Sequence, residues 1–89
     1  MATKEQNLES LNNAMSTLNQ IATNPSTPRN IRKNIAELVE GLKSGEYSIS
    51  VRAVNTISLL DDVTQDPNLP SYVRTPLWQA VSTLESIRE

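Results

Sequence analysis

Residues 24–32 read NPSTPRNIR, and residues 66–74 read DPNLPSYVR. Both prolines and the final arginine recur at a constant offset of 42 residues, and an apolar residue precedes each arginine. The same offset pairs further residues of the same type: Ser16 with Ser58, Leu18 with Leu60, Val39 with Val81, and Leu42 with Leu84. Matching turns at a fixed spacing are typical of a duplicated helix-turn-helix unit. We predict one internal repeat, over about residues 8–44 and 50–86.

Length and composition indicate one small domain, residues 1–89, with 37% hydrophobic residues to form its core. Cysteine and histidine are both absent, which removes disulfides, thiolate metal sites, the commonest zinc ligand and the usual general base. The sequence has no apolar run of membrane-spanning length, and its polar start does not resemble a signal peptide. A net charge of −2 gives no general attraction to nucleic acid. We expect a cytoplasmic protein without a cofactor or membrane contact.

Apolar residues spaced by three and four predict helices throughout. Thr3 and Gln6 fit a capping box that starts the first helix near residue 4, and Asn24 before a proline ends it. The second helix is expected to start around Pro28, with Thr27 as its N-cap, and to end at a left-handed Gly45.

Ser48 is the expected N-cap of the third helix, which ends at Asp66 before a proline. The fourth is expected to run from about Pro70 to the C-terminus with a bend at Pro76; the alternative is a shorter helix that begins at Pro76. The predicted core positions are Leu8, Leu11, Met15, Leu18 and Ala22 in the first helix, Ile31, Ile35, Leu38 and Leu42 in the second, Val54, Ile57 and Leu60 with Ala53 and Val63 alongside in the third, and Val73, Leu77, Ala80, Leu84 and Ile87 in the fourth.

Short connections make successive helices antiparallel neighbours, so the sequence predicts an all-α, four-helix up-and-down bundle. The alternative is a stack of two HEAT-like hairpins, because a Val-Arg or Ile-Arg pair lies near the start of three of the helices. Two such units bury little apolar surface unless they are capped, which favours the closed bundle.

Three motifs resemble those of a known family: PRNIR at 28–32, SVR at 50–52, and DPNLP at 66–70 followed by Arg74 and Trp78. Over nearly its whole length the chain is similar to uncharacterised protein family 0147, which comprises small archaeal proteins of unknown function. The resemblance implies a bromodomain-like four-helix bundle and an archaeal, cytoplasmic source. It implies no activity, cofactor or catalytic residue.

Arg29, Arg32 and Lys33 form the densest basic cluster in the sequence, and Arg74 occupies the position equivalent to Arg32 in the second repeat. Because helix N-termini favour anions, these four side chains are candidates for an anion or partner contact. The structural alternative is that Arg32 and Arg74 cover equivalent turns and donate hydrogen bonds to the adjoining helix. We favour this structural role.

Trp78 lies beside the predicted core stripe of the fourth helix, and its counterpart in the first repeat is Ala36. The tryptophan either fills a gap in the core or anchors a partner, because tryptophan is enriched at binding hot spots. We favour a position in the core or at its edge and keep the partner contact as the alternative.

Asp61, Asp62 and Asp66 are candidates for a divalent-cation site. Acidic residues at a helix C-terminus oppose the helix dipole, and the segment lacks the ligand density of a calcium loop. We predict no metal site.

These features favour a non-enzymatic protein–protein interaction or adaptor module, which binds a protein partner or a second copy of itself. The alternative is a nucleic-acid or ribosome-associated accessory protein that uses the basic cluster. An enzyme is the least favoured class, because the sequence has no phosphate loop and no serine or threonine with a nearby base.

Overall fold

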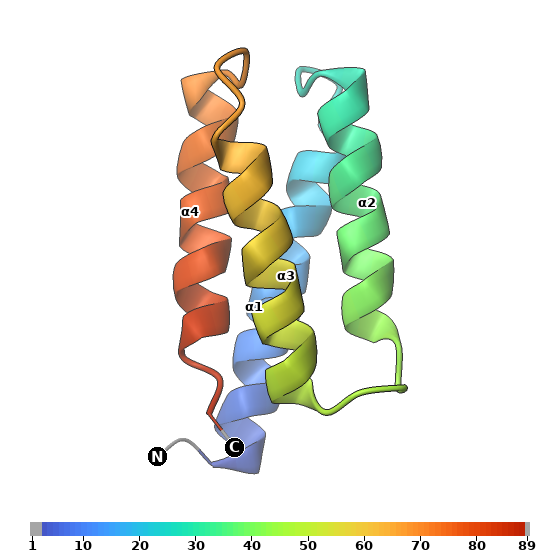
Figure 1. The fold of residues 1–89 in the computed structure, drawn as a ribbon, viewed down its shortest axis with the longest axis vertical. Coiled ribbons are helices and arrows are strands. Elements are labelled where there is room, and N and C mark those ends of the chain that lie inside the picture. The colour runs from blue at the N-terminus through green and yellow to red at the C-terminus, as the bar shows by residue number, and fades with distance from the viewer. Residues whose placement is uncertain (1–2, 89) are drawn as a thin grey trace.

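In the computed structural model, which describes residues 3–88, these residues form four helices and no strand (Figure 1). The helices are α1 (Lys4–Thr23), α2 (Arg29–Lys43), α3 (Ile49–Thr64) and α4 (Ser71–Glu85). They run alternately up and down, so the two proline-containing turns lie at one end of the bundle, and the start of α1 and the end of α4 lie at the other (Figure 1). The predicted all-α, four-helix up-and-down bundle is confirmed.

Contacts between the helices form a closed ring. Helix α1 packs against α2 and α4, helix α3 packs against the same two helices, and the contact between α1 and α4 is the most extensive. A stack of two hairpins would not make the first and last helices the closest neighbours, so the arrangement is the closed bundle. Its bromodomain-like character and the internal repeat stay predictions.

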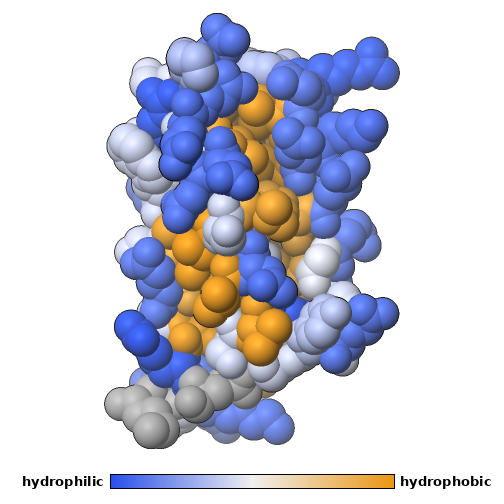
Figure 2. Space-filling view, viewed as in Figure 1, coloured by the Kyte–Doolittle hydropathy of each residue, from blue (hydrophilic) through white to orange (hydrophobic). Residues whose placement is uncertain are grey.

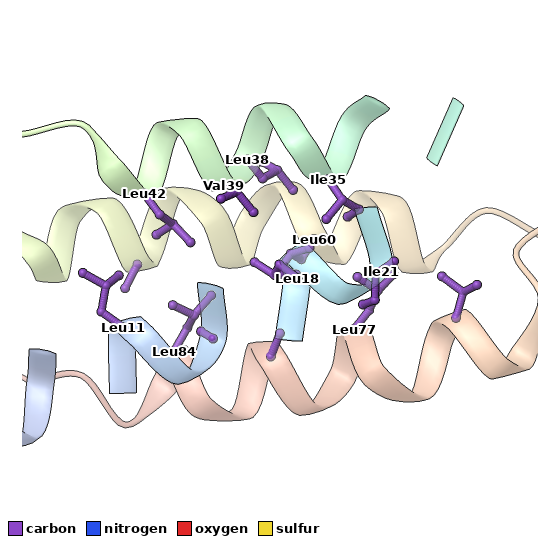
Figure 3. Close-up of a cluster of buried hydrophobic side chains, with 14 of the residues drawn as sticks. Leu11, Leu18, Ile21, Ile35, Leu38, Val39, Leu42, Leu60, Leu77 and Leu84 are labelled. Atoms are coloured by element: carbon purple, nitrogen blue, oxygen red, sulfur yellow. The ribbon is translucent and has the colours of Figure 1, made fainter. Parts of the chain in front are cut away.

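Apolar side chains from all four helices fill the centre of the bundle (Figure 3). Leu11, Leu42 and Leu84 lie at one end of this core, and Ile21, Ile35 and Leu77 lie toward the other (Figure 3). The largest side chains that are fully buried are those of Leu18, Ile35, Leu42, Leu60, Val73, Leu77 and Leu84. Every core position predicted in the second and fourth helices is buried, including the paired positions Leu38 and Ala80.

The buried face of α1 differs from the predicted one. Leu8 is exposed, and the buried residues are Asn7, Leu11, Ala14, Leu18 and Ile21. Asn7 is buried because its side chain pairs with the backbone near the C-terminus: Nδ2 donates to the Arg88 carbonyl at 2.7 Å, and Oδ1 accepts from the Arg88 N–H at 3.1 Å. This pair of bonds satisfies a buried amide. Asn7, Ala14 and Ile21 are buried in place of the predicted Leu8, Met15 and Ala22, each one residue earlier in the sequence.

The prediction for α3 was also partly wrong. Leu60 and Ala53 are buried, but Val54 is exposed, and the polar Thr56 takes a place in the core. Because α3 carries more apolar residues than its buried face accommodates, the sequence pattern alone does not show which side packs inward.

The two proline-containing turns have the same hydrogen bonds. The Asn24 side chain accepts from the backbone N–H two residues later at 2.9 Å, and the Asp66 side chain does the same at 2.9 Å. In the first turn the Thr27 N–H donates to the Asn24 carbonyl at 3.0 Å, and in the second turn the Leu69 N–H donates to the Asp66 carbonyl at 3.1 Å. The Tyr72 hydroxyl then donates to the Ser26 carbonyl, which connects the start of α4 to the first turn.

Two predicted caps of α2 were wrong. Thr27 is buried and makes no capping bond, because Pro28 itself stands at the N-cap position. The helix ends at Lys43, and its C-cap Ser44 is in extended conformation with its N–H donating to the Gly41 carbonyl. No residue of the described chain has a positive φ. A glycine in left-handed conformation is therefore not used at Gly45.

The predicted starts of α1 and α3 are confirmed, but α3 ends at Thr64 rather than at Asp66, and α4 ends at Glu85 before the C-terminus. Thr3 and Gln6 form the capping box of α1, and Ser48 caps α3 by accepting from the Val51 N–H. Helix α4 continues through Pro76 rather than starting there. None of the helices within residues 3–88 has the length and apolar content needed to cross a bilayer.

Candidate protein-interaction surface

Helix α3 exposes large apolar side chains to solvent. Val51, Val54 and Leu59 are 44%, 63% and 50% exposed. The helix has only three charged residues among 16, namely Arg52, Asp61 and Asp62. Figure 2 shows apolar side chains at the surface along the centre of this side of the molecule, between polar edges. We call the surface formed by Val51, Val54, Leu59 and the two grooves beside them the α3 face.

The first groove lies between α2 and α3. One hollow is lined by apolar Leu38, Leu59 and Val63, with Glu37 and Asp62 at its edges. A second hollow shares Glu37, Leu38 and Leu59 with it and continues toward the loop that joins the two helices. The two hollows form one continuous α2–α3 groove. It is open because α2 and α3 make the least extensive contact of the four neighbouring helix pairs.

The remaining lining residues of the α2–α3 groove are mostly polar or small. They are Asn34, Gly41, Ser44, Glu46, Tyr47, Arg52, Asn55 and Thr56.

The second groove lies between α3 and α4. Its apolar lining consists of Ala53, Val54, Ile57, Leu84 and Ile87. Its charged lining residues are one acid and one base, Glu85 and Arg88. This α3–α4 groove therefore has no net preference for one sign of charge.

The α2–α3 groove is acidic. Glu37, Glu46 and Asp62 line it, and none of the three forms an ion pair with any residue between 3 and 88. The groove also has one cationic lining residue, Arg52, whose Nη1 donates to the Leu42 carbonyl at 2.8 Å; this bond holds the guanidinium in place but leaves its charge, so the lining has three acids and one base. The groove thus combines an apolar floor with unpaired carboxylates at its edges.

The predicted basic cluster is brought together in part. Arg29, Arg32 and Lys33 line one shallow hollow between α1 and α2. Arg74 does not line it; its Nη2 donates to the Asp66 carbonyl at 3.0 Å, which is the structural role favoured for it. The assignment of these residues to an anion or partner contact stays a prediction.

The favoured position of Trp78, in the core or at its edge, was wrong. The side chain is 56% exposed, because it follows the buried Leu77 and points about 100° away from it around the helix. Ala36, at the equivalent position of the first repeat, follows the buried Ile35 and is exposed as well. Trp78 lines neither groove of the α3 face.

The acidic residues at the end of α3 do not gather. Within residues 3–88 there is no group of three or more acidic residues close enough to hold a metal ion. The Asp66 side chain accepts the Asn68 N–H of its own turn.

Sequence reasoning missed Val51 and Leu59, which belong to the α3 face. The signal that could have indicated them is the combination of many apolar and few charged residues on one helix.

The model of the Uncharacterised protein family (UPF0147) matches residues 1–87. The chain belongs to this family. Its archaeal relatives include the UPF0147 protein of Metallosphaera sedula, which is 38% identical over 89 residues and covers 100% of both chains. The UPF0147 protein of Aeropyrum pernix is 45% identical over 76 residues, which is 85% of this chain and 84% of the relative.

Two solved structures have the same fold. The unknown function protein MMP1188 aligns with a TM-score of 0.89 and 36% identity, over 99% of this chain and 100% of the other. A family member from Thermoplasma acidophilum aligns with a TM-score of 0.87 and 27% identity, over 94% and 99%. The family is uncharacterised, the names of these relatives state no enzymatic activity, and the function is unknown.

Proposed function

We propose that this protein is a non-enzymatic protein-binding module that contacts its partner through the α3 face. The observation that supports this proposal is the exposure of Val51, Val54 and Leu59 on a single helix. Apolar side chains scattered singly over a surface are normal, whereas a contiguous apolar surface with a polar rim is typical of a binding site.

The distribution of residue sizes on α3 supports the same proposal. Its buried face includes the small Ala53 and the polar Thr56, while Leu59 and Val54 remain in water. If α3 served only the stability of the bundle, its larger apolar residues would gain more by facing the core. Their position outside is explained by a partner that covers them.

Affinity capture from native extract tests the proposal. We expect the unmodified protein to retain a specific partner and Leu59→Asp to lose it. Leu8→Asp is the matched control, because Leu8 is an exposed leucine on α1 that lines neither groove of the α3 face. Circular dichroism of each variant confirms that it is folded. A partner that both variants capture equally, or lose equally, would contradict the proposal.

A second candidate function is a nucleic-acid or ribosome-associated accessory role. It is supported by the common hollow of Arg29, Arg32 and Lys33, none of which forms an ion pair in the part of the chain that the structure describes. It ranks second because the net charge is −2 and the hollow includes no aromatic side chain on which a base would stack.

RNA binding separates the two candidates. The second candidate predicts RNA binding that weakens as salt rises and is lost in Arg29→Glu with Lys33→Glu, but persists in Leu59→Asp. RNA binding that survives the double charge reversal would exclude the hollow as the RNA site.

A further inference from the structure

We infer that the α2–α3 groove binds a short, basic, amphipathic helix of the partner protein; this inference rests on the proposed function and specifies the partner's chemistry. Three properties of the groove carry it: its length, its apolar floor and the sign of its charges.

The length of the groove fits about three turns of helix. Along α3 the lining residues extend from Arg52 to Val63, and the corresponding distance is about 16 Å at 1.5 Å per residue. Two roughly antiparallel helices form the walls (Figure 1). A third helix that lies between two others is a common mode of peptide recognition, in which residues at i, i+3 or i+4, and i+7 enter the groove.

The floor provides the apolar contact. Leu59 is half exposed near the middle of the groove, and Leu38 lies opposite on α2, at the edge of the buried core. Val63 extends the floor toward one end. An apolar stripe along one side of the ligand would cover these three side chains and remove Leu59 from water.

The edges of the groove determine the charge of the ligand. Glu37 and Asp62 lie on opposite walls, Glu46 lies toward the other end, and all three are unpaired within the described residues. Lysine or arginine residues that flank the apolar stripe of the ligand would meet these carboxylates. Complementary charge of this kind selects the correct partner and rejects an acidic one.

Charge also argues against a second copy of this chain as the occupant. In a twofold dimer the same groove would face itself, so the acids of one copy would approach the acids of the other. The basic hollow of Arg29 and Lys33 lies between α1 and α2, so a twofold pairing of the grooves does not bring it opposite the carboxylates.

A pair of synthetic peptides tests the inference on the full chain. Both are helical and about three to four turns long, with leucines at i, i+4, i+7 and i+11. One has lysines on both flanks of the leucine stripe, and the other has glutamate in place of every lysine. Titration is followed by ¹⁵N–¹H NMR spectra, with binding shifts mapped onto the helices.

We expect the lysine peptide to bind, with shifts concentrated in the residues that line the α2–α3 groove. The glutamate peptide should bind at least about tenfold more weakly. Glu37→Lys with Asp62→Lys should reverse this order, because both residues are exposed and their replacement changes the charge but not the core. Leu59→Asp should abolish binding of the lysine peptide. If Leu59→Asp does not fold, Leu59→Ala replaces it in the titration. Leu8→Asp, at an exposed leucine of α1 that lines none of the three hollows of the α3 face, is the matched control and should bind normally.

Each contrary outcome overturns the inference. Equal binding of both peptides, or shifts confined to the α3–α4 groove, would show that the acidic edges do not select the ligand. Sedimentation that shows self-association of the unmodified protein, lost in Leu59→Asp, would make a second copy the occupant. If neither peptide binds, the inference is wrong but the proposed function is not, because capture of a partner that depends on Leu59 would still support it.

Discussion

Leu59 and Leu60 are adjacent leucines in opposite environments, and their substitution by alanine gives a sharp test of the packing. Leu60 is 0% exposed in the core, whereas Leu59 is 50% exposed in the α2–α3 groove. Leu60→Ala removes buried methyl groups and leaves a cavity, which costs about 3 kcal/mol, within a usual range of about 2–5 kcal/mol. Leu59→Ala removes apolar surface that is already half in water and leaves no closed cavity, so we expect a cost of about 1 kcal/mol or less.

These magnitudes are large against the total stability. A domain of this length has a free energy of unfolding of about 4–13 kcal/mol, so Leu60→Ala removes a substantial fraction of it. For a small domain each kcal/mol changes the melting temperature by about 4–8 °C. We therefore expect Leu60→Ala to lower the melting temperature by about 12–24 °C and Leu59→Ala to lower it by a few degrees at most.

Urea denaturation, followed by the helical circular dichroism signal, measures the two costs. The same substitution one residue apart changes helix propensity and the unfolded chain almost identically, so the difference between the two variants reports burial. Equal destabilisation by the two variants would refute the assignment of Leu60 to the core and of Leu59 to the groove. The folded Leu59→Ala variant is then also available for the peptide titration.

Three further substitutions test the ends and the interior of the helices by the same denaturation assay. Asn7→Ala should cost about 1–3 kcal/mol, because it removes both bonds to the Arg88 backbone; an unchanged midpoint would show that these bonds do not hold the C-terminal segment. Pro76→Ala should stabilise the protein by about 1–2 kcal/mol, since it supplies an N–H to the Tyr72 carbonyl, and a loss of stability would indicate that packing of the proline ring outweighs the bond. Thr3→Ala should cost about 1 kcal/mol by removing the capping box of α1, with Thr3→Ser as the control that retains it.

The sequence predicted α2 and α4 well. Every position of the predicted stripe in these two helices is buried, although Trp78, beside the stripe of α4, was wrongly favoured for the core. Proline positions then determine the starts of both helices, because a proline fits the first turn but interrupts the backbone bonds further along. The all-α fold class and the antiparallel order of successive helices followed from these constraints and from the short connections.

The errors in α1 arose from a polar residue with a distant partner. Two stripes with helical spacing exist in this segment, one that includes Leu8 and one that includes Asn7. A rule that places only apolar residues in the core selects the stripe that includes Leu8. Asn7 is buried because it bonds to the backbone of Arg88, 81 residues away, and the position of that partner depends on the completed bundle.

The site was missed because α3 has apolar residues on several sides. Val54 and Leu60 both satisfy the spacing rule, but only Leu60 packs inward. The choice depends on where α2 and α4 lie, and periodicity within one helix does not contain that information. The basic cluster was easier to predict, because Arg29, Arg32 and Lys33 are close in sequence on one helix and needed no tertiary contact to meet.

The apolar residues on several sides of α3 are also the basis of the proposed binding function. A helix that serves only a core gains stability when its polar residues face water, and each additional exposed leucine or valine favours aggregation. Helix α3 has the opposite distribution, with Thr56 buried and Leu59 half exposed beside unpaired carboxylates. A basic amphipathic helix in the groove would cover the apolar floor and neutralise the acidic edges together. Because one ligand explains both features, charge reversal of Glu37 and Asp62 and truncation of Leu59 should act on the same binding event.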